Sequence, residues 1–429
     1  MGQFKADFSG LSTSDIQALF KIKYEKLSQN IYNSANVMLG RVKKSYDFVG
    51  EEMRIAIPQS FSGGVGSGSL PTANKAKYGK ARLLSKKVYA RVDIDRETIK
   101  AASKDEGAFV RAMNEVVRKA VESYNRNLSR ILFSDGSGKL GTSEAVDAAD
   151  SKAALLAADS DGHIAVPIAN MKEADFEESD LVDVEVSSSA SSGGGTTIKG
   201  VEIIAVNPSN STVTLSKDKV ALGNFEDGSG NLQAANIYMQ NSKDNDPEGL
   251  KGIVTSSLSG TSYELQRDRK WSSIEEAAGG AAISTDLLNK VMLKVEKKSG
   301  KTPNLIMCSY EQYEKILNLL EDQKRYTVPT RAGLKKANGA DISFSGVEFM
   351  STSGPVGIFP DRFCDKDRVY FLNDNHIHIH HRPDFGWFDD DGTVFLRKLD
   401  EDSYEARYGG YFQIYINPAF HGVLTGLST

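Results

Sequence analysis

The chain has 429 residues, of which 40% are hydrophobic and 25% charged, so it is long enough for two or three domains with cores of their own. It contains no run of about 18 or more apolar residues and opens without an apolar signal region, which argues against membrane insertion and secretion. Its only cysteines, Cys308 and Cys364, are too few for a disulfide scaffold, and we expect them to be reduced core residues.

The net charge of −5 hides an asymmetry along the chain. Residues 1–140 hold 24 Lys and Arg against 14 Asp and Glu (+10), residues 141–249 hold 6 against 19 (−13), and the remainder holds 22 against 24 (−2). Opposite charges on different parts of one chain suit attraction between subunits, or a basic lining near an anionic content such as nucleic acid. The alternative is that the charge of solvent-exposed surfaces simply varies along the chain, with no role in binding.

The first segment, residues 1–45, is predicted to be an N-terminal arm that contains a helix. Ser12 and Asp15 have the spacing of a capping box, and a single apolar stripe at steps of three and four follows them from Ile16 to Met38. Such a helix needs a surface to lie against, on the same subunit or on the next one.

Residues 46–103 are predicted to form an extended β-hairpin arm. Met53, Ile55 and Ile57 alternate on the ascending side, and alternate apolar residues from Val88 to Ile94 mark a returning strand. The tip between them, residues 58–79, is rich in glycine and cannot build a core. A long loop of this kind is usually functional, so we interpret it as an arm that lies on a neighbouring subunit; a surface hairpin is the alternative.

A long amphipathic helix is predicted from Lys104 to Phe133, within a segment 104–135. Its apolar stripe runs from Phe109 to Leu132, and about 30 residues would span roughly 45 Å. Such a helix can serve as the spine of an elongated subunit.

Residues 136–249 change to an acidic composition rich in Ser, Gly and Asp, which indicates an inserted domain. Strand patterns cover residues 180–186, 197–206 and 212–215, and Asn207-Pro208-Ser209-Asn210 between the last two is a hairpin signal. We expect a small β-barrel or sandwich.

The last segment, residues 250–429, alternates helix, strand and helix over 286–295, 303–308 and 310–320. Further strands are predicted at 347–350, 369–372, 376–380, 394–398 and 412–416. The whole chain is therefore predicted to be α+β.

Three stretches of this chain resemble the major capsid protein of tailed bacteriophages. VDIDRETIKAAS (Val92 to Ser103) looks like that family's return from extended loop to spine helix, and TPNLIMCSYEQYEKILNLLEDQKRY (Thr302 to Tyr326) like its axial-domain strand and helix. GGYFQIYINPAFHGVLTGL (Gly409 to Leu427) is similar to its closing strand and tail. The resemblance implies the tailed-phage capsid fold, with N-arm, extended loop, spine helix, and peripheral and axial domains.

The resemblance also implies a function: many copies assemble into pentamers and hexamers of an icosahedral head that encloses double-stranded DNA. The protein would be part of the virion, assembled in the host cytoplasm, without a cofactor, a catalytic site or a membrane. Its partners would be a separate scaffolding protein, a portal, decoration proteins and DNA bound without sequence specificity.

Residues for three kinds of contact follow from this interpretation. The extended loop would contact other subunits through Phe61, Val65, Leu70, Lys75, Lys77, Tyr78 and Lys80. A loop at the capsomer axis would use Asp322, Lys324, Arg325, Tyr326 and Arg331. On charge alone, Lys21, Lys43 and Lys44 are assigned to face DNA.

Two alternative functions stay open at this point. An encapsulin-like cellular compartment would use the same architecture, although the chain length and the insertion argue against it. A metal-dependent hydrolase is the alternative from another class, because alternate histidines of the strand from His376 to His381 would share one face and could meet a metal. The intervening isoleucines suit an ordinary strand, and we predict no metal site.

Overall fold

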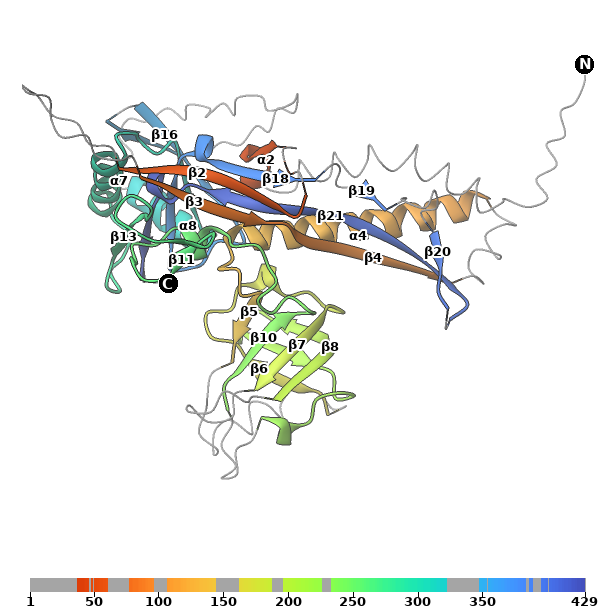
Figure 1. Cartoon of the computed structure of the whole chain (residues 1–429). Helices are drawn as coiled ribbons and strands as arrows, with labels where there is room; N and C mark the ends of the chain where they lie inside the picture. The colour runs from red at the N-terminus through yellow and green to blue at the C-terminus, as the bar shows by residue number, and fades with distance from the viewer. Residues whose placement is uncertain are drawn as a thin grey trace, which may run out of the picture. The chain divides into compact units, whose positions relative to one another are not determined.

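The computed structural model describes residues 37–45, 48, 50–60, 77–95, 106–143, 162–186, 196–225, 233–321, 347–352, 354–382, 386–388, 395–399 and 401–428. Helices and strands are mixed along the chain (Figure 1), so the predicted α+β class is confirmed. The chain divides into two compact units. The first comprises Met1–Ser129, Lys335–Ile342 and Ile377–Tyr415, and the second comprises Arg130–Leu334, Ser343–His376 and Ile416–Thr429.

The predicted arm contains a two-stranded hairpin in the first unit. Strand β2 (Glu52–Ser60) pairs antiparallel with β3 (Lys77–Leu84), with Glu52 opposite Leu84 and Ile57 opposite Gly79. On β3, Ala81 and Leu83 are buried while their neighbours are exposed or half-buried, as expected for a strand with one covered face. The ascending strand was therefore predicted correctly.

The predicted partner of that strand was wrong. Strand β4 (Lys86–Asp95), which carries the alternating residues from Val88 to Ile94, pairs instead with β21 (Ser403–Ile416), with Asp95 opposite Ser403 and Lys86 opposite Phe412. Strand β3 was not predicted: its first three residues were assigned to the tip and the rest to no strand, because the residues that it buries beside Leu83 are Gly79 and Ala81, which are too small to give an apolar pattern.

A six-stranded sheet organises the rest of the first unit. Its strands run in the order β1, β18, β21 and β19, and β20 and β4 also pair with β21. Strand β21 is thus the centre of the sheet. The remaining elements of this unit are α2 (Val37–Arg41), β1 (Lys43–Ser45), β18 (Ile377–His381), β19 (Gly386–Trp387) and β20 (Phe395–Arg397).

The predicted long helix is present as α4 (Glu106–Phe133). Within the first unit it runs alongside β21 (Figure 1), and the Tyr124 ring meets Tyr408 of β21 edge to face, with ring centroids 5.2 Å apart. Tyr124 and Leu128 are almost fully buried, whereas Arg118 and Lys119 are exposed, so the part of the apolar stripe whose side chains are described faces away from solvent. The last turn, from Arg130, belongs to the second unit.

The acidic segment folds into a small closed β-barrel in the second unit. Six strands are hydrogen-bonded in the order β5, β10, β7, β8, β9, β6, and a bridge between Ser143 and Ile168 joins the last strand back to the first. Buried Val, Ile, Leu and Phe side chains fill its interior, Val201, Ile203 and Ile237 among them. The strands are β5 (Lys139–Thr142), β6 (Ile164–Pro167), β7 (Leu181–Val186), β8 (Thr196–Asn207), β9 (Thr212–Leu215) and β10 (Ala235–Met239).

The predicted hairpin in this barrel is also present. Asn207 accepts a hydrogen bond from the Ser209 backbone N–H at 3.1 Å, which closes the turn between β8 and β9. Where the chain leaves the barrel, Gly249 lies against the carbonyl oxygen of Ile131, so that a side chain there would collide with the end of α4.

A second six-stranded sheet forms the rest of the second unit, in the order β13, β22, β17, β14, β16, β15. Helix α7 begins at the Ser284 cap, whose Oγ accepts from the Leu287 N–H, and ends at Gly300 with φ of 69°. The elements are α7 (Thr285–Ser299), α8 (Tyr310–Glu321), β13 (Ile274–Ala277), β14 (Leu305–Cys308), β15 (Val347–Ser351), β16 (Gly354–Pro360), β17 (Val369–Leu372) and β22 (Gly422–Thr425).

Short elements connect these layers. They are α6 (Leu250–Ile253), the paired strands β11 (Thr261–Ser262) and β12 (Leu265–Gln266), and the 3₁₀ turns η1 (Glu173–Asp175), η2 (Leu222–Asn224), η3 (Asp374–His376) and η4 (Pro418–Phe420).

Candidate functional site

The predicted contact residues of the arm fall partly within the described hairpin. Lys77 and Lys80 are exposed on β3, and the Tyr78 side chain is 57% exposed. The other four predicted contacts lie outside the described residues: Phe61, Val65, Leu70 and Lys75. The described part of the arm therefore presents two lysines and a tyrosine to its surroundings.

Of the residues assigned to DNA, Lys43 and Lys44 are described and Lys21 is not. Both lie in β1, which pairs in parallel with β18. Lys44 is half-buried, and this burial lowers its pKa to about 8, whereas Lys43 is exposed. The predicted axis loop lies outside the described residues: Asp322, Lys324, Arg325, Tyr326 and Arg331.

The histidine segment does not form one ligand face. His376 lies in η3, where its ring stacks on Phe420 with centroids 3.8 Å apart, while His378 and His380 lie in β18 with centroids 5.9 Å apart. His381 is buried, with Nδ1 2.9 Å from the carbonyl oxygen of Arg382. Within the described part of the chain, no three His, Cys, Asp or Glu side chains are grouped so that they could hold a metal ion.

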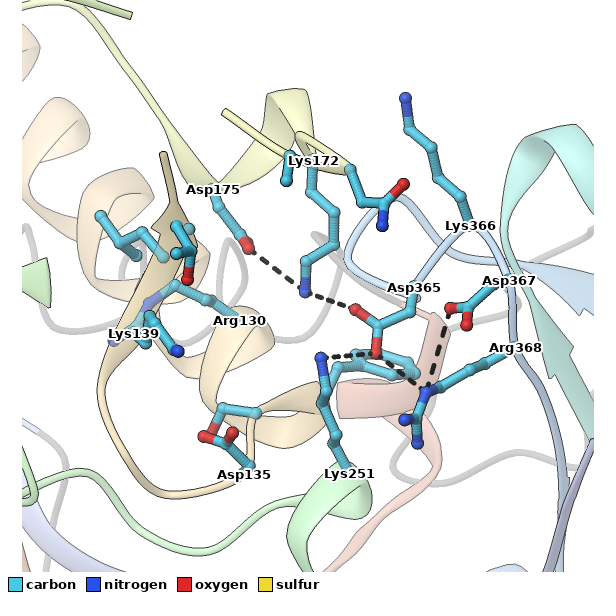
Figure 2. A pocket seen from close by; sticks show the side chains of 17 residues that line it. Arg130, Asp135, Lys139, Lys172, Asp175, Lys251, Asp365, Lys366, Asp367 and Arg368 are labelled. Carbon is cyan, nitrogen blue, oxygen red and sulfur yellow. Dashed lines mark ion pairs between the residues drawn. The ribbon is translucent and has the colours of Figure 1, made fainter. Parts of the chain in front are cut away.

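A charged pocket of about 430 Å³ lies in the second unit, where the barrel meets the second sheet (Figure 2). Its wall combines the end of α4, strand β5, the turn that carries η1, helix α6 and the segment 365–368 between β16 and β17. It is lined by ten charged residues: Arg130, Asp135, Lys139, Lys172, Asp175, Lys251, Asp365, Lys366, Asp367 and Arg368.

Lys172 joins the barrel to the second sheet at this pocket. Its Nζ lies 3.2 Å from Oδ2 of Asp175, three residues further on, and 3.1 Å from Oδ1 of Asp365. The other oxygen of Asp365 lies 3.1 Å from Nζ of Lys251 and 3.5 Å from Nε of Arg368. Figure 2 shows these pairs as one chain of dashed lines centred on Asp365.

A second ion pair fastens the barrel to the end of α4. Nη2 of Arg130 lies 2.8 Å from Oδ2 of Asp246, and both side chains are more than nine-tenths buried. A buried charge is costly unless it is paired, so loss of either partner would leave an expensive isolated ion. Both pairs thus hold the barrel at a fixed place on its unit.

The chemistry of the pocket is that of a structural ion cluster. Burial alone would raise the pKa of Asp365, but Lys172, Lys251 and Arg368 more than offset this, and the pKa lies below its ordinary value. Asp365 is therefore ionised at neutral pH and cannot donate a proton. Nearby Cys364 is buried and its pKa is raised well above the ordinary value, so it is a thiol and not a nucleophilic thiolate.

The pocket could not be found in the sequence. Lys172 and Asp175 have ordinary helix-like spacing, and Asp365 is remote from both along the chain. The one available signal was that Lys172 is one of only six basic residues in the acidic segment 141–249.

Part of the chain matches a known protein family. Residues 230–391 match the family model described as SU10 major capsid protein. This range covers the last barrel strand, the whole segment from α6 to β18 and the short strand β19. None of the curated proteins matches the chain by sequence.

Solved structures of shell proteins show a distant likeness. A chain of the cyanophage A-1(L) capsid asymmetric unit is 11% identical at a TM-score of 0.48, with 91% of this chain and 93% of that chain covered. A chain of the satellite phage P4 procapsid is 9% identical at 0.41, with 96% of each covered. A chain of the SrpI encapsulin from Synechococcus elongatus PCC 7942 is 8% identical at 0.40, with 90% and 85% covered.

Among the described helices, none combines the length and the apolar character that a membrane crossing requires.

Proposed function

We propose that this chain, a major capsid protein of a tailed phage by its match over residues 230–391, assembles into pentamers and hexamers of an icosahedral head that encloses double-stranded DNA. The family match is the observation that carries this proposal. The chain would act as a building block with no catalytic role. Assembly would take place in the host cytoplasm, with a separate scaffolding protein and a portal, and decoration proteins would bind the finished shell.

The hairpin supports a role for the arm in joining subunits. A two-stranded sheet is marginal by itself, and β2 and β3 pair only with each other within the described part of the chain. Strands with open edges are templates for a further chain. The exposed Lys77, Tyr78 and Lys80 would then contact a neighbouring subunit, and the axis loop with Asp322, Lys324, Arg325, Tyr326 and Arg331 would meet its copies around the capsomer axis.

Contact with the packaged DNA would be electrostatic and without base recognition. Lys43 is exposed on β1 and suits such a contact together with Lys21. Lys44 suits it less well, because it is half-buried and this burial lowers its pKa to about 8.

Negative-stain microscopy and light scattering on the purified full chain test the proposal, with and without co-expression of its neighbouring genes. Closed shells or rings are expected. Replacement of residues 61–76 by a two-residue turn keeps the β2–β3 ladder and should abolish them. A monomer or dimer under every condition would contradict the proposal, and shells that hold a protein cargo and no nucleic acid would favour the encapsulin-like alternative.

A further inference from the structure

Helices α7 and α8 cover the same face of the second sheet. Leu288 and Val291 of α7 and Ile316 of α8 share one core with Ile306 and Phe371 of the sheet. Because both helices turn their apolar sides to that core, their opposite sides point away from it and are exposed. Those two outer faces differ in charge.

The outer face of α7 is basic around one leucine. Leu293 is 53% exposed and is flanked by Lys290, Lys294 and Lys297. Lys290 and Lys294 both pair with Glu276 of β13, whereas Lys297 has no ion pair among the described residues. We refer to these four residues of α7 as the basic stripe.

The outer face of α8 is acidic around two apolar side chains. Tyr310 is 55% exposed and Leu317 39% exposed, and Glu311 and Glu314 are exposed between them. The spacing of Tyr310, Glu314 and Leu317 places all three on one side of a helix. Glu311 has only a loose pair with Lys366 at 3.6 Å, and Glu314 has none in the described part of the chain. These four residues are the acidic stripe.

We infer that the basic stripe of one copy docks against the acidic stripe of a neighbouring copy. This rests on the proposed function, since it names the partner surfaces by which the building blocks would join. Lys297 would face Glu314, and Leu293 would lie between Tyr310 and Leu317, so an apolar centre is surrounded by opposite charges.

The charges favour a second copy of the chain, bound through the opposite stripe, over other partners. Two basic stripes brought together would set lysines against lysines, and two acidic stripes would repel likewise. A nucleic acid would suit the basic stripe but leaves the acidic stripe unexplained. A contact between two different patches repeats from copy to copy and closes into a ring when the rotation allows.

Engineered cysteines test the contact directly in the full chain. The native Cys308 and Cys364 are buried, so the double variant Leu293→Cys/Leu317→Cys adds the exposed thiols. A disulfide needs Cα atoms within about 7 Å. Under mild oxidation, this variant should give a ladder of covalent multimers on a non-reducing gel. Each single variant, and the control Leu181→Cys/Leu293→Cys with an exposed barrel leucine, should stay monomeric or stop at a dimer.

The outcomes separate this inference from the proposed function. Shells without a ladder would overturn the inference and leave the capsid proposal standing. A ladder without shells would support the contact between the stripes and contradict the proposed assembly into a shell. Absence of both would overturn both.

Charge reversal provides the second test. Lys297→Glu alone and Glu314→Lys alone should each weaken the contact by on the order of tenfold, and the combined variant should restore assembly. Lys199→Glu, an equal change at an exposed barrel lysine, is the matched control and should have no effect. The inference would be overturned if both single variants and the combined variant assembled as well as the Lys199→Glu control. It would also be overturned if the combined variant did not recover assembly.

Discussion

The barrel and the hairpin are both β-structures, but only the barrel is complete by itself. Every barrel strand has two neighbours, and a bridge from Ser143 to Ile168 closes the sheet around a buried core. In the hairpin, β2 and β3 pair only with each other among the described strands, and the side chains of Met53, Ile55 and Ile57 stay half-exposed. The difference fits the proposal that a neighbouring subunit covers the half-exposed side of the hairpin.

The ion pairs of the two regions differ in the same way. Lys172 and Asp365 are both mostly buried, whereas Glu52 of the hairpin pairs with Arg54 and Arg82 at sites that keep 32% or more of the side chain in water. Exposed pairs contribute little to stability, and loss of one partner of a buried pair is costly. The barrel therefore depends on its charges far more than the hairpin does.

Lys172→Met should have the largest effect on stability. The change leaves Asp175 and Asp365 without their shared cation, which we expect to cost about 3–5 kcal/mol. Thermal unfolding of the full chain followed by circular dichroism would measure it. Lys366→Met is the matched control at the same pocket, because Lys366 is more exposed and should cost less than about 1 kcal/mol. Equal losses for the two variants would show that the Lys172 pairs do not hold the barrel.

Ile237→Ala is expected to rank next. Ile237 is fully buried inside the barrel, and its truncation leaves a cavity that should cost about 2–5 kcal/mol. Hydrogen exchange of the barrel amides is the suitable measurement because it reports opening of this part alone. Exchange should accelerate in β7, β8 and β10 and stay unchanged in β2 and β3. Equal acceleration in the hairpin would mean that the two regions unfold together.

Acid should weaken the second unit through His421. Burial, with a smaller contribution from His376, lowers the pKa of His421 to about 3, and its Nδ1 accepts from the Asn373 N–H at 3.2 Å. The unfolded chain therefore binds a proton that the folded chain excludes. Stability is fully present above the ordinary histidine pKa of about 6.5 and is lost as the pH falls below it, by up to about 1.4 kcal/mol per pH unit.

His421→Asn should remove that slope between pH 6.5 and about 5, because an amide oxygen can accept the same hydrogen bond and does not titrate. Melting temperatures across this range would measure it. The matched control is His163→Asn, since Nδ1 of His163 also accepts a backbone hydrogen bond, from Lys217, at a more exposed site of the barrel. If stability still falls with pH as steeply in His421→Asn as in the native chain, His421 is not the group that causes the loss.

Local patterns predicted the elements that depend on local sequence. Helix α4 follows from a long apolar stripe, β17 from four consecutive apolar residues, and the β8–β9 turn from Asn207 and Pro208. In each case, the residues that favour the element are the ones that form it.

Elements set by distant partners could not be predicted. The sequence indicated a strand only from Phe412 to Ile416, but β21 begins at Ser403, which pairs with Asp95 of β4. Within this added length Glu405 is buried and lies against Arg91 of β4, with 2.6 Å between Nη2 and Oε2. No local pattern predicts a buried glutamate in a central strand. The Lys172 cluster was missed for the same reason, since its members come from remote parts of the chain.

Ile55→Ala in β2 should have the smallest effect on the isolated chain. Ile55 is only half-buried, so truncation should cost less than about 1 kcal/mol, well below the cost of Ile237→Ala. In assembled shells the result should differ, because a neighbouring subunit would cover the hairpin and protect its amides. Hydrogen exchange of the β2 and β3 amides measures the stability of the hairpin in the free protein and its protection in shells, with the barrel amides of β8 as an internal control. If another copy completes the arm, protection of the hairpin amides should rise on assembly and fall again in Ile55→Ala shells. Equal exchange in free protein and in shells would mean that the hairpin stays uncovered.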